Sequence, residues 1–166
     1  MANDRVERSE VVAGRGLRFA GWLVDTLVVG LLGLIPLLFG VGGWPRFVVF
    51  EVLAAVDAIV LVAWLGGNVG NLVVGTQVVV AADASRTGTG RATVRWAVLR
   101  VPLYLGALVG AWWFSAIWWP VVYGPILFTR LRQGLHDRAA GVVVITSRHH
   151  PDGWALAKSF FRRAAR

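Results

Sequence analysis

Charged residues interrupt several long apolar segments of this sequence, and their types could carry chemistry. Asp25, Glu51 and Asp57 lie inside such segments, and Arg95 and Arg100 lie where another begins. Charged side chains among apolar ones are costly unless they pair with one another or face water. The five residues are therefore candidates for binding a proton or a cation, or for pairing helices with each other.

The state of each carboxylate depends on its neighbours. A buried carboxylate without a cation favours the protonated form, which suits a proton carrier, whereas one beside Arg95 or Arg100 stays ionised. Glu51 and Asp57 are about 240° apart around a helix, so we expect them to have different partners. The pattern does not decide which carboxylate is ionised.

Arg18 and Asp25 are the charged residues of the first apolar segment. Seven residues of helix turn through about 700°, so both side chains project from one face. In one interpretation Arg18 extends to the lipid headgroups, and Asp25 caps a helix or pairs with a basic group on a neighbouring helix. In the other, the two residues lie on an ion or proton pathway.

Other reactive residues do not form a recognisable catalytic or metal site. His136 and Asp137 are adjacent, but no nucleophile or third ligand accompanies them. The chain has no cysteine, and Gly88 and Gly90 belong to no phosphate-binding glycine motif. We therefore expect neither an enzyme nor a bound metal or cofactor.

The elements that position these residues are apolar helices. Hydrophobic residues make up 57% of the chain and the mean hydropathy is +0.64, which is high for a soluble domain. The apolar segments cover residues 17–39, 47–65 and 101–129, each about as long as a bilayer-spanning helix. The predicted fold is an all-α integral membrane protein, a small bundle of three to four transmembrane helices in contact with the lipid bilayer.

The distribution of basic residues predicts the topology. The net charge is +8, yet no nucleic-acid-binding module is present, so nucleic acid is not expected as a partner. Only Arg46 lies between the first two apolar segments, and the other basic residues flank them elsewhere. The positive-inside rule places the N-terminus, residues 66–100 and the C-terminal tail on the cytoplasmic side, which requires an even number of crossings.

The third apolar segment decides between three and four crossings. A four-pass arrangement needs a third helix from near Arg91 or Arg95 to about Ser115, and a short return segment at 116–128. Tryptophans would then mark the outer interface, namely Trp112, Trp113, Trp118 and Trp119. The alternative is one continuous helix over 101–129, whose small residues Gly106 and Gly110 would suit close helix packing.

The remaining segments are short. Residues 72–80 and 141–145 are β-branched and flanked by glycine, so we expect extended pieces that pair at the cytoplasmic surface. Residues 83–90 are the clearest loop. We expect residues 1–14 to be a cytoplasmic segment, 15–146 the transmembrane domain, and 147–166 a basic amphipathic helix on the inner leaflet.

Two blocks carry a family resemblance. Arg18 and Asp25 in the first helix, together with residues 134–141 (GLHDRAAG) and the valines after them, resemble the RDD family of bacterial membrane proteins. The resemblance runs from about residue 14 to residue 145. It assigns the arginine and the two aspartates of the family to Arg18, Asp25 and Asp137, beside His136, and implies a multi-pass protein of the bacterial inner membrane.

The chain departs from this family in its middle motif. There Asn71, Leu72 and Gln77 replace basic positions, which puts a complete transport cycle in doubt. The resemblance implies transport of a cation, a proton or a small solute, and the small helical faces favour a homo-oligomer. The alternative is a non-catalytic accessory subunit that contacts other membrane subunits.

Overall fold

The computed structural model describes residues 12–146, and two apolar helical runs dominate its first half. The first comprises α2 (Arg15–Leu32) and α3 (Ile35–Leu38). The second comprises α4 (Gly43–Ala55), the π-helix η1 (Val56–Leu61) and α5 (Val62–Leu65). Runs of 24 and 23 residues are long and apolar enough to cross a membrane, and only 17% of each apolar window is buried. Their outward-facing apolar side chains are typical of contact with lipid.

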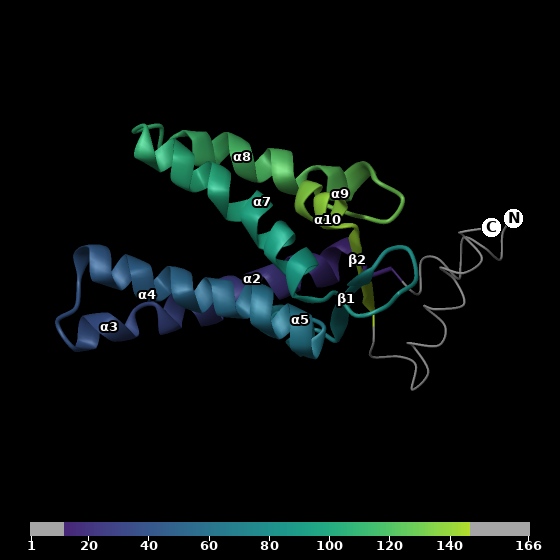
Figure 1. Ribbon diagram of the computed structural model, residues 1–166, viewed down its shortest axis with the longest axis horizontal. Helices are drawn as coiled ribbons and strands as arrows, with labels where there is room; N and C mark the ends of the chain where they lie inside the picture. Colours follow the sequence, from purple (N-terminus) through teal and green to yellow (C-terminus); the bar gives the residue numbers. More distant parts are fainter. Residues whose placement is uncertain (1–11, 147–166) are drawn as a thin grey trace, which may run out of the picture.

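The second half contains a helical hairpin. Helix α7 (Thr89–Leu108) is followed by α8 (Phe114–Tyr123) and α9 (Pro125–Phe128). In Figure 1 this hairpin and the one formed by α2 to α5 meet near the sheet and diverge away from it. The four apolar helical segments therefore form two antiparallel pairs.

The hairpin corrects the prediction for residues 101–129. One continuous helix over this segment is wrong because Gly110 has a φ of +72°, a left-handed conformation that a helix does not contain. Gly106 instead packs close to the Phe114 side chain across the turn. The return expected after Ser115 occurs earlier, because α7 already ends at Leu108.

A short helix and a two-stranded sheet form one end of the molecule. Helix α6 (Val69–Val73) precedes β1 (Thr76–Val80), which pairs antiparallel with β2 (Val142–Thr146). The predicted pairing is confirmed, with Val78 opposite Val144. The strand bounds differ from the prediction, since Asn68 caps α6 over residues 69–73 and Gly141, with a φ of +64°, ends α10 (Leu135–Ala140) before β2 begins.

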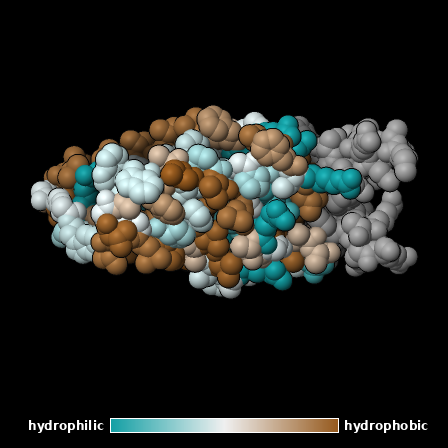
Figure 2. Space-filling model, turned by 90° about the horizontal axis from the view of Figure 1, so that it is seen from above, coloured by the Kyte–Doolittle hydropathy of each residue, from teal (hydrophilic) through white to brown (hydrophobic). Residues whose placement is uncertain are grey.

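The buried apolar core lies around this sheet. Val12 forms a bridge with Ile145, and the Ala13 N–H donates to the Val144 carbonyl at 3.0 Å. Ala92 of α7 and Val62 of α5 pack in one cluster with Ala13 and with Val78 and Val144 of the strands. Figure 2 shows hydrophobic residues over much of the elongated body and most polar residues near the sheet end. The chain segments at 12–13, 76–80 and 142–146 thus share one end of the helices.

Two predicted features fall partly or wholly outside the described residues. These are most of the N-terminal segment and the basic tail at 147–166. The predicted loop at 83–90 is shorter than expected, because Thr89 and Gly90 already belong to α7.

Candidate functional site

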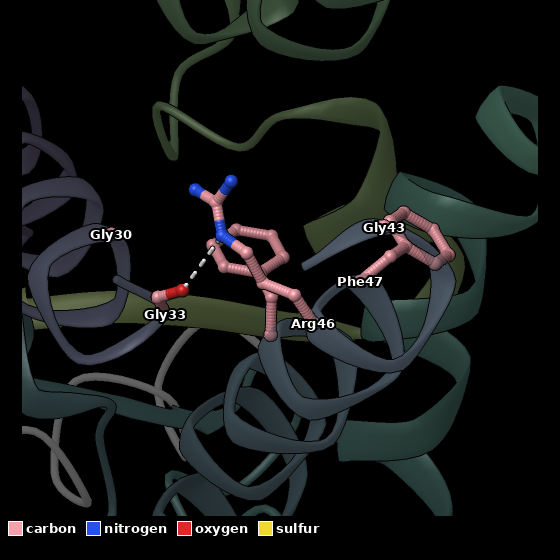
Figure 3. A pocket seen from close by; sticks show the side chains of 6 residues that line it. Gly30, Gly33, Gly43, Arg46 and Phe47 are labelled. Atoms are coloured by element: carbon pink, nitrogen blue, oxygen red, sulfur yellow. Dashed lines mark hydrogen bonds between the residues drawn. The ribbon is translucent and has the colours of Figure 1, made fainter. Parts of the chain in front are cut away.

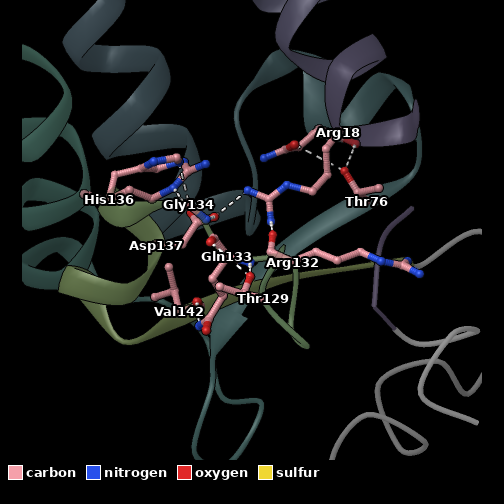
Figure 4. Close-up of polar contacts among 11 residues, drawn as sticks. Arg18, Thr76, Thr129, Arg132, Gln133, Gly134, His136, Asp137 and Val142 are labelled. Atoms are coloured by element: carbon pink, nitrogen blue, oxygen red, sulfur yellow. Dashed lines mark hydrogen bonds and ion pairs between the residues drawn. The ribbon is translucent and has the colours of Figure 1, made fainter. Parts of the chain in front are cut away.

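Asp137 lies at the centre of a buried group of charges, which we call the Asp137 cluster and which contains Arg18, Arg95, His136 and Asp137. Arg95 donates from Nε to Asp137 Oδ1 at 2.9 Å, and Arg18 pairs through Nη2 with Oδ2. The Gly134 N–H at the start of α10 also donates to Oδ2, at 3.2 Å. One carboxylate therefore joins α2, α7 and α10 (Figure 4).

This arrangement corrects the interpretation of Arg18. Its side chain is only 7% exposed and does not extend to headgroups. Besides Asp137, it donates from Nη1 to the Arg132 carbonyl at 2.7 Å. The guanidinium offers several donors in a fixed plane, so it can bind a carboxylate and a carbonyl at once.

The electrostatics of the Asp137 cluster keep Asp137 ionised. Burial alone would raise the pKa of its carboxyl, but His136, Arg18 and Arg95 outweigh burial and hold this pKa well below its usual range. Burial lowers the pKa of His136 to about 3, against the opposite influence of Asp137. His136 is therefore uncharged at neutral pH, and the two arginines supply the compensating positive charge.

His136 is fixed by its surroundings. Its Nε2 atom lies 3.2 Å from Asp137 Oδ1, and its ring centroid lies 5.1 Å from that of Tyr123. A Cβ on Gly134 would come within 2.5 Å of the imidazole, so the ring occupies space that only glycine leaves open. This contact explains the glycine of the GLHDRAAG block in terms of packing.

Asp25 and Asp57 meet at a different place, which we call the α6 carboxylate pair. Asp25 on α2 accepts from the Gly70 N–H and from Asn68 Nδ2. Asp57 in η1 accepts from the Val69 N–H at 2.9 Å. The first N–H groups of a helix have no partner within the helix, so these two carboxylates satisfy the start of α6.

Close contact between α2 and α6 makes this arrangement possible. A Cβ on Gly70 would overlap the carbonyl of Gly21, so both glycines lie where the two backbones meet. Asp57 is 7% exposed, and no salt bridge of the described residues includes either aspartate. Of the two alternatives for Asp25, the structure shows the cap and not the basic partner, because its hydrogen-bond donors are the Gly70 N–H and Asn68 Nδ2.

The two groups of residues are nevertheless neighbours. Arg95 interacts electrostatically with Asp25 and with Asp57, while its direct ion pair is with Asp137. A change of charge at the α6 carboxylate pair would therefore be felt at the Asp137 cluster.

Glu51 belongs to a third group. It accepts a hydrogen bond from the Tyr104 hydroxyl, and its Oε1 lies 3.6 Å from Arg100 Nη1. The Arg100 guanidinium also lies over the Phe50 ring, 5.8 Å from its centroid. Glu51 and Asp57 thus have different partners, as expected from their angular separation, and Glu51 links α4 to α7.

Sequence reasoning missed three participants. Asn68 caps α6, and an asparagine after a glycine pair is a recognisable helix-start signal. Tyr104 and Tyr123 carried no signal beyond their aromatic character. The π-helix that contains Asp57 was also missed, since hydropathy does not distinguish a π-helix from an α-helix.

The described residues contain no group of three or more His, Cys, Asp or Glu side chains that could hold a metal ion. The α6 carboxylate pair offers two carboxylates together with backbone N–H donors. Such a site can exchange protons or interact with a small cation through its oxygens, and it offers no nucleophile.

Comparison with known proteins gives one match. The family model described as RDD family matches residues 12–141, which include Arg18, Asp25 and Asp137. No curated protein and no solved structure gives a significant match. The matched residues include all the helices described above, the strand β1 and both groups of aspartates. With most of its length matched and its apolar helices exposed, this chain is a membrane protein that belongs to the RDD family.

Proposed function

We propose that the protein transports a proton or a small cation across the membrane and that the α6 carboxylate pair is its binding site. The observation that supports this proposal is the meeting of Asp25 and Asp57, from two spanning helices, without an ion pair of their own. Ionisable residues inside membrane segments mark ion and proton pathways. No enzymatic step is part of the proposal.

The chemistry of the proposed site follows from charge. Two carboxylates held by the same short helix repel each other when both are ionised. A proton or a cation that binds between them relieves this repulsion, and its release restores it. The neighbouring Arg95 is held by Asp137, so it stays in place while the occupancy of the site changes.

The π-helix η1 supports the proposal, because a change in its geometry would move Asp57. Asp57 is the second residue of η1, and the helix returns to regular α geometry at α5. Short π segments occur frequently at functional sites, where one extra residue widens a helical turn. A change in this turn would move Asp57 relative to the Val69 N–H, which donates a hydrogen bond to its carboxylate.

The proposal includes four membrane crossings in the bacterial inner membrane, with the sheet end on the cytoplasmic side. It is supported by the basic residues near that end and by the hairpin of α7 and α8. The test is a single cysteine at Gly153, probed in intact cells with a membrane-impermeant maleimide. No labelling is expected, whereas a control cysteine at the exposed Phe39 should be labelled. Labelling of Gly153→Cys from outside would contradict the topology.

We also propose a homo-oligomer. Four short helices enclose little volume, and the apolar side chains of the described helices remain exposed over most of their length. Native mass spectrometry of the detergent-solubilised protein should give a mass that is a multiple of the single chain. A single-chain mass in mild detergent would contradict this part of the proposal.

Flux measurements test the transport proposal. Purified protein in liposomes should move protons or sodium ions, and Asp25→Asn and Asp57→Asn should each abolish this flux while the protein remains folded. Asp83→Asn is the matched control, because Asp83 is an exposed aspartate in the loop before α7. Unchanged flux in both site variants would overturn the assignment.

The altered middle motif favours a second function, that of an accessory subunit. The resemblance implies basic residues at the positions of Asn71, Leu72 and Gln77. In an accessory subunit, the α6 carboxylate pair would only hold α6 in place. Purification from native membranes in mild detergent distinguishes the two functions. A stoichiometric second protein, lost in Asp25→Asn, would support the subunit; a lone homo-oligomer with flux would support the transporter.

A further inference from the structure

A cavity of about 400 Å³ lies between α2 and α4, at the end of the helices away from the sheet. Its wall combines three glycines with two aromatic rings and one charged side chain: Gly30, Gly33, Gly43, Arg46, Phe47 and Phe50. A Cβ added at Gly30 or Gly43 would meet no atom within 4 Å, so the space beside these glycines is open.

Arg46 is the charged residue of this cavity, and its charge is not compensated there. Its Nε donates to the Gly33 carbonyl at 3.2 Å, which fixes the side chain (Figure 3). Within residues 12–146, no ion pair or further hydrogen bond occupies its terminal nitrogens, Nη1 and Nη2. None of the six lining residues is acidic, and the nearby Glu51 pairs with Arg100 instead.

The position of Arg46 adds to its preference for an anion. Arg46 lies in the first turn of α4, where the helix carries partial positive charge. An arginine presents a planar fork of donors that matches two oxygens of a phosphate group. The cavity therefore offers both the charge and the donors that recognise a phosphate ester.

The rim of the cavity is apolar and aromatic. Trp44 stacks on Phe47 with ring centroids 5.1 Å apart, and these side chains are 73% and 41% exposed. Tryptophan is enriched at the depth of the lipid headgroups. Exposed apolar side chains of α3 and α4 continue from the rim and include Leu37, Leu38 and Val48. A ligand with a phosphate and hydrocarbon chains complements both parts of this surface.

We propose that this cavity binds the headgroup phosphate of an anionic phospholipid, with Arg46 as its ligand and the acyl chains against α3 and α4. The lipid is held in the leaflet at the end of the helices opposite the sheet. This inference is independent of the transport proposal, because it uses no residue of the α6 carboxylate pair.

The test measures binding of phosphatidylglycerol to the full chain in mild detergent by native mass spectrometry, with phosphatidylcholine as the comparison. Arg46→Gln should weaken phosphatidylglycerol binding about tenfold, the effect of one charge-assisted hydrogen bond. Gly30→Leu should weaken it similarly by filling the cavity while the charge remains. Arg130→Gln removes the same charge from an exposed position at the sheet end and should change the binding little.

Melting temperatures show whether each variant is folded. Arg46→Gln and Gly30→Leu should melt close to the unmodified protein in lipid-free detergent, because neither change removes a buried contact other than one hydrogen bond. Equal binding of phosphatidylglycerol by all variants would overturn the proposal. Displacement of the lipid by millimolar inorganic phosphate would overturn the lipid assignment in favour of a free anion.

Discussion

The two groups of aspartates in this protein are built differently although they are neighbours. Asp137 is fully buried and receives two arginines and one backbone N–H. Asp25 and Asp57 receive only backbone and amide N–H groups at the start of α6. A carboxylate with two cations is kept charged, whereas a carboxylate held by neutral donors can change its charge without leaving an arginine unpaired.

This difference separates a structural role from an exchangeable one. The Asp137 cluster ties α2 and α7 to α10 and thereby positions the sheet end. In the α6 carboxylate pair, Asp25 lies on α2 seven residues after Arg18, and Asp57 lies in η1 of the second spanning run. The residues to which the family resemblance assigns one arginine and two aspartates, Arg18, Asp25 and Asp137, therefore include one aspartate of each kind.

Removing the charge of Asp137 should have the largest effect. Asp137→Asn leaves Arg18 and Arg95 buried without a carboxylate, which should destabilise the fold by about 3–5 kcal/mol. Thermal denaturation in detergent and the yield of folded protein measure this loss, with Asp83→Asn as the exposed control. A melting temperature equal to that of the control would remove the distinction between the two groups.

The pH dependence of stability should report His136. Its pKa is about 3 when folded and 6.5 for the unperturbed side chain, so the unfolded chain binds the proton more tightly. The uncharged His136 therefore contributes to the free energy of unfolding. This contribution is fully present above pH 6.5 and is lost as the pH falls, by about 2 kcal/mol between pH 6.5 and pH 5. The ionised Asp137 also stabilises the fold, because its pKa is lower in the folded chain than the ordinary value of 3.8. This stabilisation is lost only as the pH falls below 3.8.

Denaturant unfolding at several pH values measures this slope. His136→Gln should be less stable at neutral pH but should show a much flatter pH dependence between pH 6.5 and pH 5. The same slope in the variant would show that another group titrates there, and that His136 is not the neutral member of the Asp137 cluster.

A smaller effect is expected at the contact between α2 and α6. Gly70→Ala introduces a methyl group that overlaps the Gly21 carbonyl, so the helices must separate. Overpacking of this kind destabilises by about 1–3 kcal/mol. Gly16→Ala on α2 meets no atom within 4 Å and is the matched control in the same melting experiment. If both variants melt alike, the α6 carboxylate pair does not depend on close backbone contact.

The smallest effect on stability is expected for Asp25→Asn. The asparagine carbonyl still accepts from the Gly70 N–H, but its NH2 group cannot accept from Asn68 Nδ2. The loss of this one hydrogen bond should change the free energy of unfolding by about 1 kcal/mol. The difference between this small change and the large one for Asp137→Asn distinguishes the two groups of aspartates most clearly. A loss as large as that of Asp137→Asn would make Asp25 a structural residue.

Much of the fold could be predicted because it depends on local pattern. Hydropathy located the two spanning runs, and β-branched residues flanked by glycine located strands that pair as expected. The hairpin bend at Gly110 depends on one backbone conformation, which explains why both a continuous helix and a later turn were compatible with the sequence.

The site was harder to predict because its contacts join distant residues. Arg18 and Asp137 are separated by 119 residues, and spacing along one helix carries no information about such a pair. The sequence left open whether Asp25 caps a helix or has a basic partner, because the short helix α6 that supplies the N–H group could not be recognised from periodicity. Asn68 was the available signal, as a cap for a helix too short to show periodicity.

Chemical labelling tests the central difference most directly. Dicyclohexylcarbodiimide is an apolar reagent that modifies protonated carboxyl groups within membranes, and peptide mass spectrometry locates the product. We expect modification at Asp25 or Asp57 in the folded protein and none at Asp137, which stays ionised between its arginines. Modification of Asp137, or of neither Asp25 nor Asp57 across the pH range in which the protein is folded, would contradict the account.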